Sequence, residues 1–233
     1  MEVRLSKRMR LVADMVHEKR VVDIGCDHAF VSIYLAQKPD MERVIAMDVK
    51  TGPIDIAKAN VAAYMLADKI DVRMSDGFDK LSVGEADAAV IAGMGGYLMI
   101  DILEAGKEHL ENGISLVLQP QSDIPEVRRY LDSVGYIIED EDMLIEDGKY
   151  YTIMRAVPRE ENLVEYTEDD YNYGPILLKK KHTVLGKFLE FSREKSLAIV
   201  EKLNATGSDK SKERVKQLST EIEYNEGILN KYF

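Results

Sequence analysis

Residues able to do chemistry are concentrated where short apolar runs end in the first half of the chain. The first run, residues 21–24, contains Asp23 and leads into the string Gly25-Cys26-Asp27-His28-Ala29. The run over residues 21–24 predicts a strand, and the stretch over residues 31–37 predicts a helix. A tight turn would join them. In such a turn Gly25 lets the backbone pass close to a ligand, and the start of the helix offers free N–H groups. A nucleotide-type cofactor site begins in this way, and so does an ordinary turn that contains a glycine.

The acids of this turn favour one kind of cofactor. A dinucleotide-binding turn, G-x-G-x-x-G, would need glycine where this chain has Asp27 and Phe30, and a carboxylate there would repel a pyrophosphate. S-adenosylmethionine has no phosphate, but it carries a sulfonium and an ammonium group that Asp23 and Asp27 would attract. We therefore expect S-adenosylmethionine rather than NAD, bound by Asp23, Gly25, Cys26 and Asp27.

A second acid closes the next apolar run, residues 43–49. Asp48 follows Gly25 by 23 residues, near the spacing at which an acid hydrogen-bonds the ribose hydroxyls of a bound adenosine. A strand-terminal aspartate can also be only a cap or turn residue. With Gly25 upstream, the ribose role is the stronger prediction.

A third acid follows the strand expected over residues 70–74. Asp76, or the backbone beside it, would accept a hydrogen bond from the adenine amino group, with Phe78 or Met74 against the ring. Asp76-Gly77 is also a common turn dipeptide, which needs no ligand.

Three glycines follow a fourth apolar run, residues 86–92, in the string Gly93-Met94-Gly95-Gly96. Ligands bind at the carboxyl ends of strands in open α/β sheets, so this bare backbone would lie where a substrate sits. The string is therefore either the wall that faces the substrate or a device for close packing. Its place beside the first strand favours the wall.

The remaining periodicity predicts an α/β fold of the Rossmann-like class, a seven-stranded sheet with helices on both faces. Helices are expected over residues 5–16, 53–66, 98–110 and 124–133, and a fifth strand over 114–118. Residues 136–144 and 149–157, joined through Asp147-Gly148, predict a closing β-hairpin. Together these elements form a domain over residues 1–160.

The end of the chain has a different pattern. Residues 161–174 lack a clear period and are expected to be a linker, whereas residues 175–233 predict two amphipathic helices in an antiparallel, coiled-coil hairpin. The string 205–208 would separate them, with Ser208 as the N-cap of the second helix.

Charge is distributed unevenly along the chain. The formal net charge is −11, yet residues 1–20 contain six basic against three acidic residues, and residues 175–233 contain twelve against eight. A polyanion could contact these ends while the acidic middle stays clear of it, although solvated helix faces would have the same composition. The basic candidates are Lys7, Arg8, Arg10, Lys179, Lys180 and Lys181.

Composition narrows the class of protein further. No apolar run approaches the roughly 18 residues of a membrane span, and the N-terminal segment lacks the apolar part of a signal peptide, so we expect a cytoplasmic protein without a membrane partner. Cys26 is the only cysteine, which excludes an internal disulfide or a cysteine zinc cluster, and no metal is expected. Filling space is a commoner role for such a cysteine than reactivity.

With these residues assembled, the chain resembles the bacterial tRNA (adenine-22-N1)-methyltransferase family, TrmK. The resemblance covers nearly the whole length, including the helical hairpin. It is carried by Leu5-Ser6-Lys7-Arg8, Val22-Asp23-Ile24-Gly25-Cys26-Asp27-His28-Ala29, Ile91-Ala92-Gly93-Met94-Gly95-Gly96 and Leu118-Gln119-Pro120-Gln121.

The resemblance implies a class I methyltransferase that uses S-adenosylmethionine to methylate N1 of an adenine in the D-arm region of tRNA. Separately, we expect the protein to be a monomer. By matching position, Asp23, Gly25 and Asp27 belong to the cofactor turn, Asp48 to the ribose, Asp76-Gly77 to the adenine and residues 93–96 to the methyl-transfer face. The basic residues at the two ends would then bind tRNA. The Asn/Asp-Pro-Pro-Tyr/Phe string of many adenine methyltransferases is replaced here by Gly93-Met94-Gly95-Gly96, which argues against N6 chemistry.

The implied reaction needs little from side chains. N1 of neutral adenine has a free lone pair, so catalysis is mainly alignment, and the target base must be turned out of its stack. A carboxylate could stabilise the moving positive charge, and Asp27 is the first candidate for this role. His28 is the next candidate for a part in the chemical step, beside Gly93, Met94 and Gly95. The alternatives are a methyltransferase for a small metabolite or protein, and a non-catalytic tRNA-binding module of the same fold.

Overall fold

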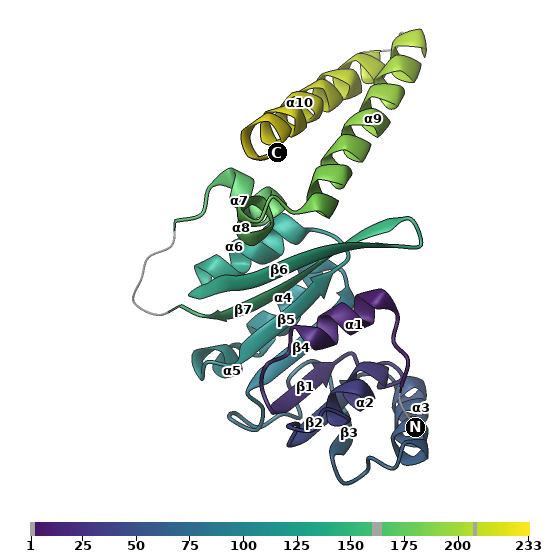
Figure 1. Cartoon of the computed structure of the whole chain (residues 1–233), viewed down its shortest axis with the longest axis vertical. Helices are drawn as coiled ribbons and strands as arrows, with labels where there is room; N and C mark the ends of the chain where they lie inside the picture. Colours follow the sequence, from purple (N-terminus) through teal and green to yellow (C-terminus); the bar gives the residue numbers. More distant parts are fainter. Residues whose placement is uncertain (1–2, 160–164, 207–208) are drawn as a thin grey trace. The chain divides into compact units, whose positions relative to one another are not determined.

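The computed structural model describes residues 3–159, 165–206 and 209–233. It divides into two compact units, Met1–Thr167 and Glu168–Phe233. The first unit is built on a single sheet and the second is helical (Figure 1).

The sheet of the first unit has seven strands in the order β3-β2-β1-β4-β5-β7-β6. The first five strands are parallel, and β7 is antiparallel to both β5 and β6. The expected seven-stranded sheet with a terminal hairpin is confirmed. Its strands are β1 (Arg20–Ile24), β2 (Arg43–Asp48), β3 (Ile70–Met74), β4 (Ala88–Met94), β5 (Ser115–Pro120), β6 (Tyr136–Glu146) and β7 (Lys149–Pro158).

The central parallel strands β4 and β5 are largely apolar because both of their faces are covered. Every residue of β5 is buried, as are the first four of β4. The hairpin turn has Asp147 and Gly148 both at positive φ, 49° and 73°, which suits the twist of a two-residue connection.

Helices cover both faces of the sheet. Helices α1 (Lys7–Asp14), α2 (Phe30–Ala36) and α3 (Thr51–Ala63) share one buried cluster with alternate strand residues such as Val44 and Val90. Strand neighbours such as Ile45 and Ile91 point to the opposite face, because successive side chains of a strand alternate. The other helices of this unit are α4 (Gly96–Ala105), α5 (Lys107–Glu111) and α6 (Ile124–Ser133).

Two expected helices differ from those observed. The helix expected over 98–110 is two helices, α4 and α5, joined at Gly106, where a Cβ would lie 2.2 Å from the Phe78 ring. Helix α3 begins at Thr51, ahead of Pro53, because the first-turn N–H groups of a helix have no intrahelical partner and proline is tolerated there.

The order of the strands determines where a ligand can sit. From β1 the chain moves outward through β2 to β3 and then returns to the other side of β1 as β4. The connections after β1 and β4 therefore lead away in opposite directions and leave a crevice at the carboxyl ends of these two strands. Gly25 and Gly93 lie at this switch point.

The described residues of the second unit form four helices, α7 (Glu168–Tyr173), α8 (Pro175–Lys179), α9 (Thr183–Thr206) and α10 (Asp209–Tyr232). Arg193 of α9 pairs with Glu226 of α10 at 3.5 Å, and a Cβ at Gly186 would lie 3.3 Å from Phe233. These contacts show that α9 and α10 run antiparallel.

The segment before this hairpin differs from the sequence prediction. Residues 168–173, expected within the linker, form α7 and belong to the second unit. Asp169 accepts hydrogen bonds from Tyr224 Oη at 2.8 Å, Lys231 Nζ at 2.7 Å and Tyr232 Oη at 3.1 Å, so partners distant in the sequence stabilise α7. The first of the two helices expected over residues 175–233 is also interrupted after α8, where Lys181 has a φ of 49°. Ser208, the predicted N-cap, lies outside the described residues.

Candidate active site

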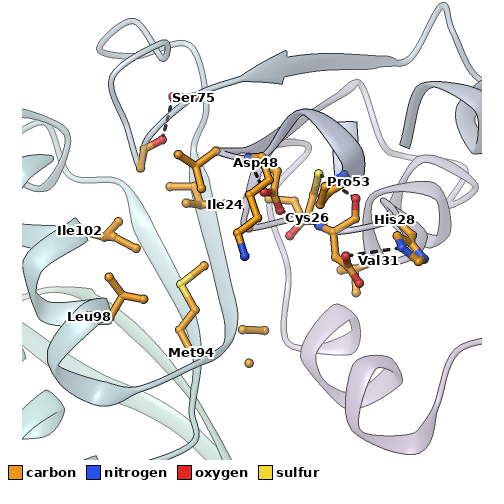
Figure 2. Close-up of a pocket in the computed structure, with 18 of the residues that line it drawn as sticks. Ile24, Cys26, His28, Val31, Asp48, Pro53, Ser75, Met94, Leu98 and Ile102 are labelled. Carbon is orange, nitrogen blue, oxygen red and sulfur yellow. Dashed lines mark hydrogen bonds and ion pairs between the residues drawn. The ribbon is translucent and has the colours of Figure 1, made fainter. Parts of the chain in front are cut away.

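A pocket of about 620 Å³ opens at the carboxyl ends of β1, β2 and β4 (Figure 2). Its volume is in the range of small-molecule cofactor sites. In Figure 2, Met94, Leu98 and Ile102 lie on one side, and Asp48, Cys26 and Pro53 lie on the other. The lining residues are Arg8, Met9, Asp23, Ile24, Gly25, Cys26, Asp27, His28, Phe30, Val31, Asp48, Val49, Lys50, Pro53, Ser75, Asp76, Gly77, Ala92, Gly93, Met94, Leu98, Ile102 and Gln121.

The turn after β1 is tightly wound and held against β2. The backbone N–H groups of Gly25 and Cys26 both donate to the Met47 carbonyl oxygen, at 2.8 and 2.9 Å. Gly25 has a φ of 77°, and a Cβ there would lie 2.2 Å from Met94 Cε. The positive φ therefore favours glycine at this position, whereas the nearby Met94 methyl is the end of a flexible side chain that can move.

Asp48 ties this turn to the loop after β2. Its Oδ2 accepts from the Asp27 backbone N–H at 3.1 Å, and its Oδ1 accepts from the Lys50 backbone N–H at 3.0 Å. Each carboxylate oxygen has a second lone pair, so Asp48 can still accept from a ligand hydroxyl. The cap role and the ribose role, separate alternatives in the sequence, are compatible in the structure.

Asp23 is buried beneath the pocket, with 4% of its surface exposed. The Ser32 hydroxyl donates to its Oδ2 at 2.6 Å. Burial raises the pKa of the Asp23 carboxyl to about 6, because a poorly solvated charge is disfavoured; the Ser32 hydrogen bond opposes this shift and the charge of Asp48 adds to it.

Asp27 and His28 lie at the accessible edge of the pocket. His28 Nε2 is 3.6 Å from Asp27 Oδ1, and their side chains are 42% and 73% exposed respectively. The neighbouring Cys26 is buried, and burial together with the charges of Asp23 and Asp48 raises the pKa of its thiol. Asp27 is therefore accessible to a ligand, whereas the burial and raised thiol pKa of Cys26 favour the space-filling role over a reactive one.

The turn after β3 both shapes the backbone and lines the pocket. Gly77 has a φ of 50°, and the Ser75 hydroxyl donates to its carbonyl oxygen at 3.0 Å. The prediction that Phe78 faces the adenine ring is wrong, because Phe78 is buried and stacks on His109 with ring centroids 4.8 Å apart. Met74, the other predicted ring contact, is not among the lining residues. The apolar lining comes instead from Pro53, Leu98 and Ile102.

The residues of the glycine string at the end of β4 are divided between the pocket wall and close packing. Strand β4 runs through a bulge at Gly93 to Met94, two residues beyond its expected end, and these two residues form part of the pocket wall. Gly95 caps α4 and does not line the pocket. Gly96 is a close-packing position, because a Cβ there would lie 2.5 Å from the Ser122 carbonyl oxygen.

The predicted tRNA-binding residues fall in different places. Arg8 lines the pocket, Arg10 pairs with Asp14 at 3.4 Å, and Lys7 is exposed on α1. Lys179, Lys180 and Lys181 are exposed where α8 leads into α9. Arg8 was predicted as a surface contact because the helical period shows only that it does not share the apolar face of α1.

Two glutamines were missed as site residues. Gln119, which is fully buried, accepts from Arg8 Nη1 at 2.6 Å, and Gln121 lines the pocket. Their signal was present in the sequence, since polar residues directly after a buried strand lie at the ligand edge of a parallel sheet.

The pocket brings together all eight predicted cofactor residues: Asp23, Gly25, Cys26, Asp27, Asp48, Asp76, Gly77 and Gly93. No group of histidine, cysteine and acidic residues among residues 3–159, 165–206 and 209–233 could bind a metal ion. In the same described ranges, no helix has the length and apolarity needed to cross a membrane.

Comparisons with known proteins agree with this geometry. The model of the TrmK family, tRNA (adenine(22)-N(1))-methyltransferase, matches residues 21–227. The Bacillus subtilis tRNA (adenine(22)-N(1))-methyltransferase is 33% identical over 242 residues, covering 98% of each chain. The crystal structure of B. subtilis TrmK is 32% identical and superposes with a TM-score of 0.81 over 98% of this chain and 100% of that one.

A further solved structure contains the predicted cofactor. It is a putative tRNA (m1A22) methyltransferase from Streptococcus pneumoniae in complex with S-adenosyl-L-methionine, 31% identical, with a TM-score of 0.83 over 97% of this chain and 100% of that one. The chain belongs to the tRNA (adenine(22)-N(1))-methyltransferase family, TrmK.

Proposed function

We propose that this protein transfers the methyl group of S-adenosylmethionine to N1 of adenine 22 in tRNA. Family membership supports the reaction and the substrate. The observation that carries the proposal is the pocket at the β1/β4 switch point, where Asp23, Asp27 and Asp48 surround a turn that lacks the glycines of a phosphate site. Such a site suits a sulfonium and an ammonium group better than a diphosphate.

In this proposal each aspartate lies near a different part of the cofactor. Asp23 and Asp27 face its cationic methionine end, and Asp48 accepts hydrogen bonds from the ribose. Asp76, exposed at the turn after β3, lies toward the adenine, with Pro53 and Ile102 providing apolar surface.

The chemical step is a direct displacement. The N1 lone pair of adenine forms the new N–C bond while the C–S bond of the sulfonium breaks, and the positive charge moves to the methylated ring. No proton has to leave N1, so no general base is required, and most of the rate enhancement comes from holding the reactants in line. A carboxylate at Asp27 would stabilise the positive charge along the whole path. His28 is expected to be dispensable as a base.

Substrate binding extends beyond the pocket. Lys179, Lys180 and Lys181 are exposed and fit a role in binding tRNA phosphates, as does Lys7 on α1. We further propose that the enzyme acts as a monomer in the cytoplasm.

The test is methylation of two matched transcripts. The protein and labelled S-adenosylmethionine are incubated with a tRNA containing adenine 22 and with the same tRNA containing guanine 22, and nuclease digests are analysed by mass spectrometry. We expect N1-methyladenosine from the first transcript and no product from the second. Methylation of the guanine transcript at another base, or an N6 product, would overturn the proposal. Label incorporated only into a small molecule or a protein would favour the other methyltransferase class.

A further inference from the structure

Gln121 is a polar residue of the pocket that the roles above leave unused. It follows β5 directly, and its backbone N–H donates to the Met94 carbonyl oxygen at 2.8 Å. This bond joins the end of β5 to the methyl-transfer face and fixes the backbone from which the Gln121 side chain extends. Its Nε2 lies 3.8 Å from where a Cβ at Gly93 would be.

The side-chain amide of Gln121 is available to a ligand, whereas that of Gln119 is not. Gln119 is fully buried; its Oε1 accepts from Arg8 and its Nε2 donates to the Pro120 carbonyl oxygen at 3.0 Å. Gln121 is exposed at the pocket, and within the described part of the chain its amide makes no hydrogen bond. Of the two side-chain amides at the end of β5, only that of Gln121 can form hydrogen bonds with a substrate.

The reaction restricts how the target base can be recognised. N1 must keep its lone pair directed at the methyl group, so no protein donor can bind it. The Hoogsteen edge stays free, with an N6 donor next to an N7 acceptor. A glutamine amide offers an acceptor and a donor in the matching arrangement. The ionised carboxylates of Asp27 and Asp48 can only accept and cannot bind N7.

We propose that Gln121 is a specificity-determining residue that binds the Hoogsteen edge of the flipped target adenine. Its Oε1 accepts from N6 and its Nε2 donates to N7, while the bare backbone of Gly93 leaves room for the flat base. Guanine would present its O6 acceptor to Oε1 and lose that hydrogen bond. This inference rests on the proposed function, because it requires adenine as the methyl acceptor.

The experiment combines protein variants with a substrate changed by one atom. Single-turnover methylation is measured for the wild type and for Gln121→Ala, on tRNA with adenine or 7-deazaadenine at position 22. We expect 7-deazaadenine to slow the wild type about tenfold, because one hydrogen bond is lost. Gln121→Ala should slow the reaction on adenine by roughly five- to 150-fold, yet show a less than twofold further loss on 7-deazaadenine.

Two further variants keep the result interpretable. Gln121→Glu preserves size and the N6 acceptor but cannot donate to N7, so it should also be slow on adenine and insensitive to 7-deazaadenine. Gln37→Ala, outside the pocket, should respond to both substrates as the wild type does. Affinity for S-adenosylmethionine, measured by calorimetry, should be unchanged in the Gln121 variants.

The outcomes separate this inference from the proposed function. If 7-deazaadenine slows the wild type and Gln121→Ala equally, Gln121 does not contact N7 and the inference is overturned. The proposed function would still stand, provided that the wild type methylates adenine 22. A wild type that does not methylate position 22 would overturn both.

Discussion

Arg8 and Gln119, 111 residues apart in the sequence, share a hydrogen bond of 2.6 Å at the pocket. The Arg8 guanidinium also lies over the Tyr151 ring, 4.9 Å from its centroid, and a Cβ at Gly93 would be 3.7 Å from its Nη1. Among the described residues no carboxylate pairs with Arg8. A neutral amide and an aromatic ring thus hold a positive charge in a pocket that is otherwise rich in aspartates.

The first prediction concerns that charge. S-adenosylmethionine carries a carboxylate as well as two cationic groups, and Arg8 can pair with it. We expect Arg8→Met to raise the Kd for S-adenosylmethionine about 10- to 100-fold, because a hydrogen bond between charged groups is lost, and to change tRNA affinity less than twofold. Arg10→Met is the matched control, since Arg10 lies on the same helix but pairs with Asp14. Weaker tRNA binding with unchanged cofactor affinity would restore the surface role that the sequence suggested.

A second prediction separates two aspartates by kinetics. An interaction made mainly in the transition state affects kcat, whereas uniform cofactor binding affects KM. Asp27→Asn should chiefly lower kcat, and Asp48→Asn should chiefly raise the KM for S-adenosylmethionine, with a loss of about 1–3 kcal/mol. Steady-state rates at varied cofactor concentration decide this. An Asp27→Asn enzyme with wild-type kcat would remove Asp27 from the catalytic residues.

A third prediction follows from the raised pKa of Asp23. In the free protein this carboxyl becomes protonated as pH falls through about 6, which removes a negative charge that attracts the cofactor. The Kd for S-adenosylmethionine should therefore rise about tenfold between pH 7 and pH 5. Asp23→Asn should bind weakly with little pH dependence, and calorimetry across this range tests both. A wild type with flat affinity would place the cofactor charges away from Asp23.

The Asp23 carboxyl also affects the stability of the free protein. Its contribution to stability falls as pH rises, whereas its contribution to cofactor affinity increases. The folded-state pKa of about 6 lies above the unfolded value of 3.8, so the folded state binds the proton more tightly. This contribution to stability is complete below about pH 4 and is lost as pH rises through about 6. Relative to the wild type, Asp23→Asn should lack this decline in thermal unfolding experiments over the same range.

A fourth prediction uses two glycines that begin helices. Gly96→Ala places a methyl group 2.5 Å from the Ser122 backbone oxygen and should destabilise the fold by about 1–3 kcal/mol. Gly52 of α3 has nothing within 4 Å of an added Cβ, so Gly52→Ala should stabilise by about 0.4–1 kcal/mol. Unfolding midpoints of the two variants should move in opposite directions. Equal shifts would mean that Gly96 is not a close-packing position.

A fifth prediction concerns the basic turn of the helical unit. Replacing Lys179, Lys180 and Lys181 with glutamine should weaken tRNA binding and reduce the slope of log Kd against log salt by about two to three, because fewer counterions are released. The control replaces Lys195, Lys202 and Lys216, exposed on α9 and α10, and removes the same net charge. If both triple variants lower the slope equally, general charge rather than this turn attracts tRNA.

Much of the fold was readable from the sequence because local patterns decide it. The strand over residues 70–74 and the helix over 124–133 have the predicted bounds, and the Asp147-Gly148 turn joins β6 and β7 as expected. Strands buried on both faces, such as β5, are largely apolar, and such runs, bounded by turn residues, are visible without any knowledge of their neighbours. The strand over residues 70–74 is only partly buried and alternates apolar with charged residues, which is also a local pattern.

The site was also partly readable, for the same reason. In parallel strands, polar residues at the carboxyl ends converge on one edge, so Asp23, Asp48 and Gly93 could be grouped before their distances were known. What each of them contacts was not visible. No sequence pattern indicates the buried hydrogen bond that the Ser32 hydroxyl donates to Asp23.

Tertiary structure alone decided the features that depend on distant partners. The position between α4 and α5 has room only for Gly106 because the Phe78 ring occupies the space beside it, and the stacking of Phe78 on His109 keeps Phe78 out of the pocket. Helix α7 formed where a linker was expected because residues of α10 satisfy Asp169. Arg8 turned into the pocket because β5 presents Gln119 to it. Helical periodicity tells which side chains share a face, but the group across from that face is determined only when the chain is packed.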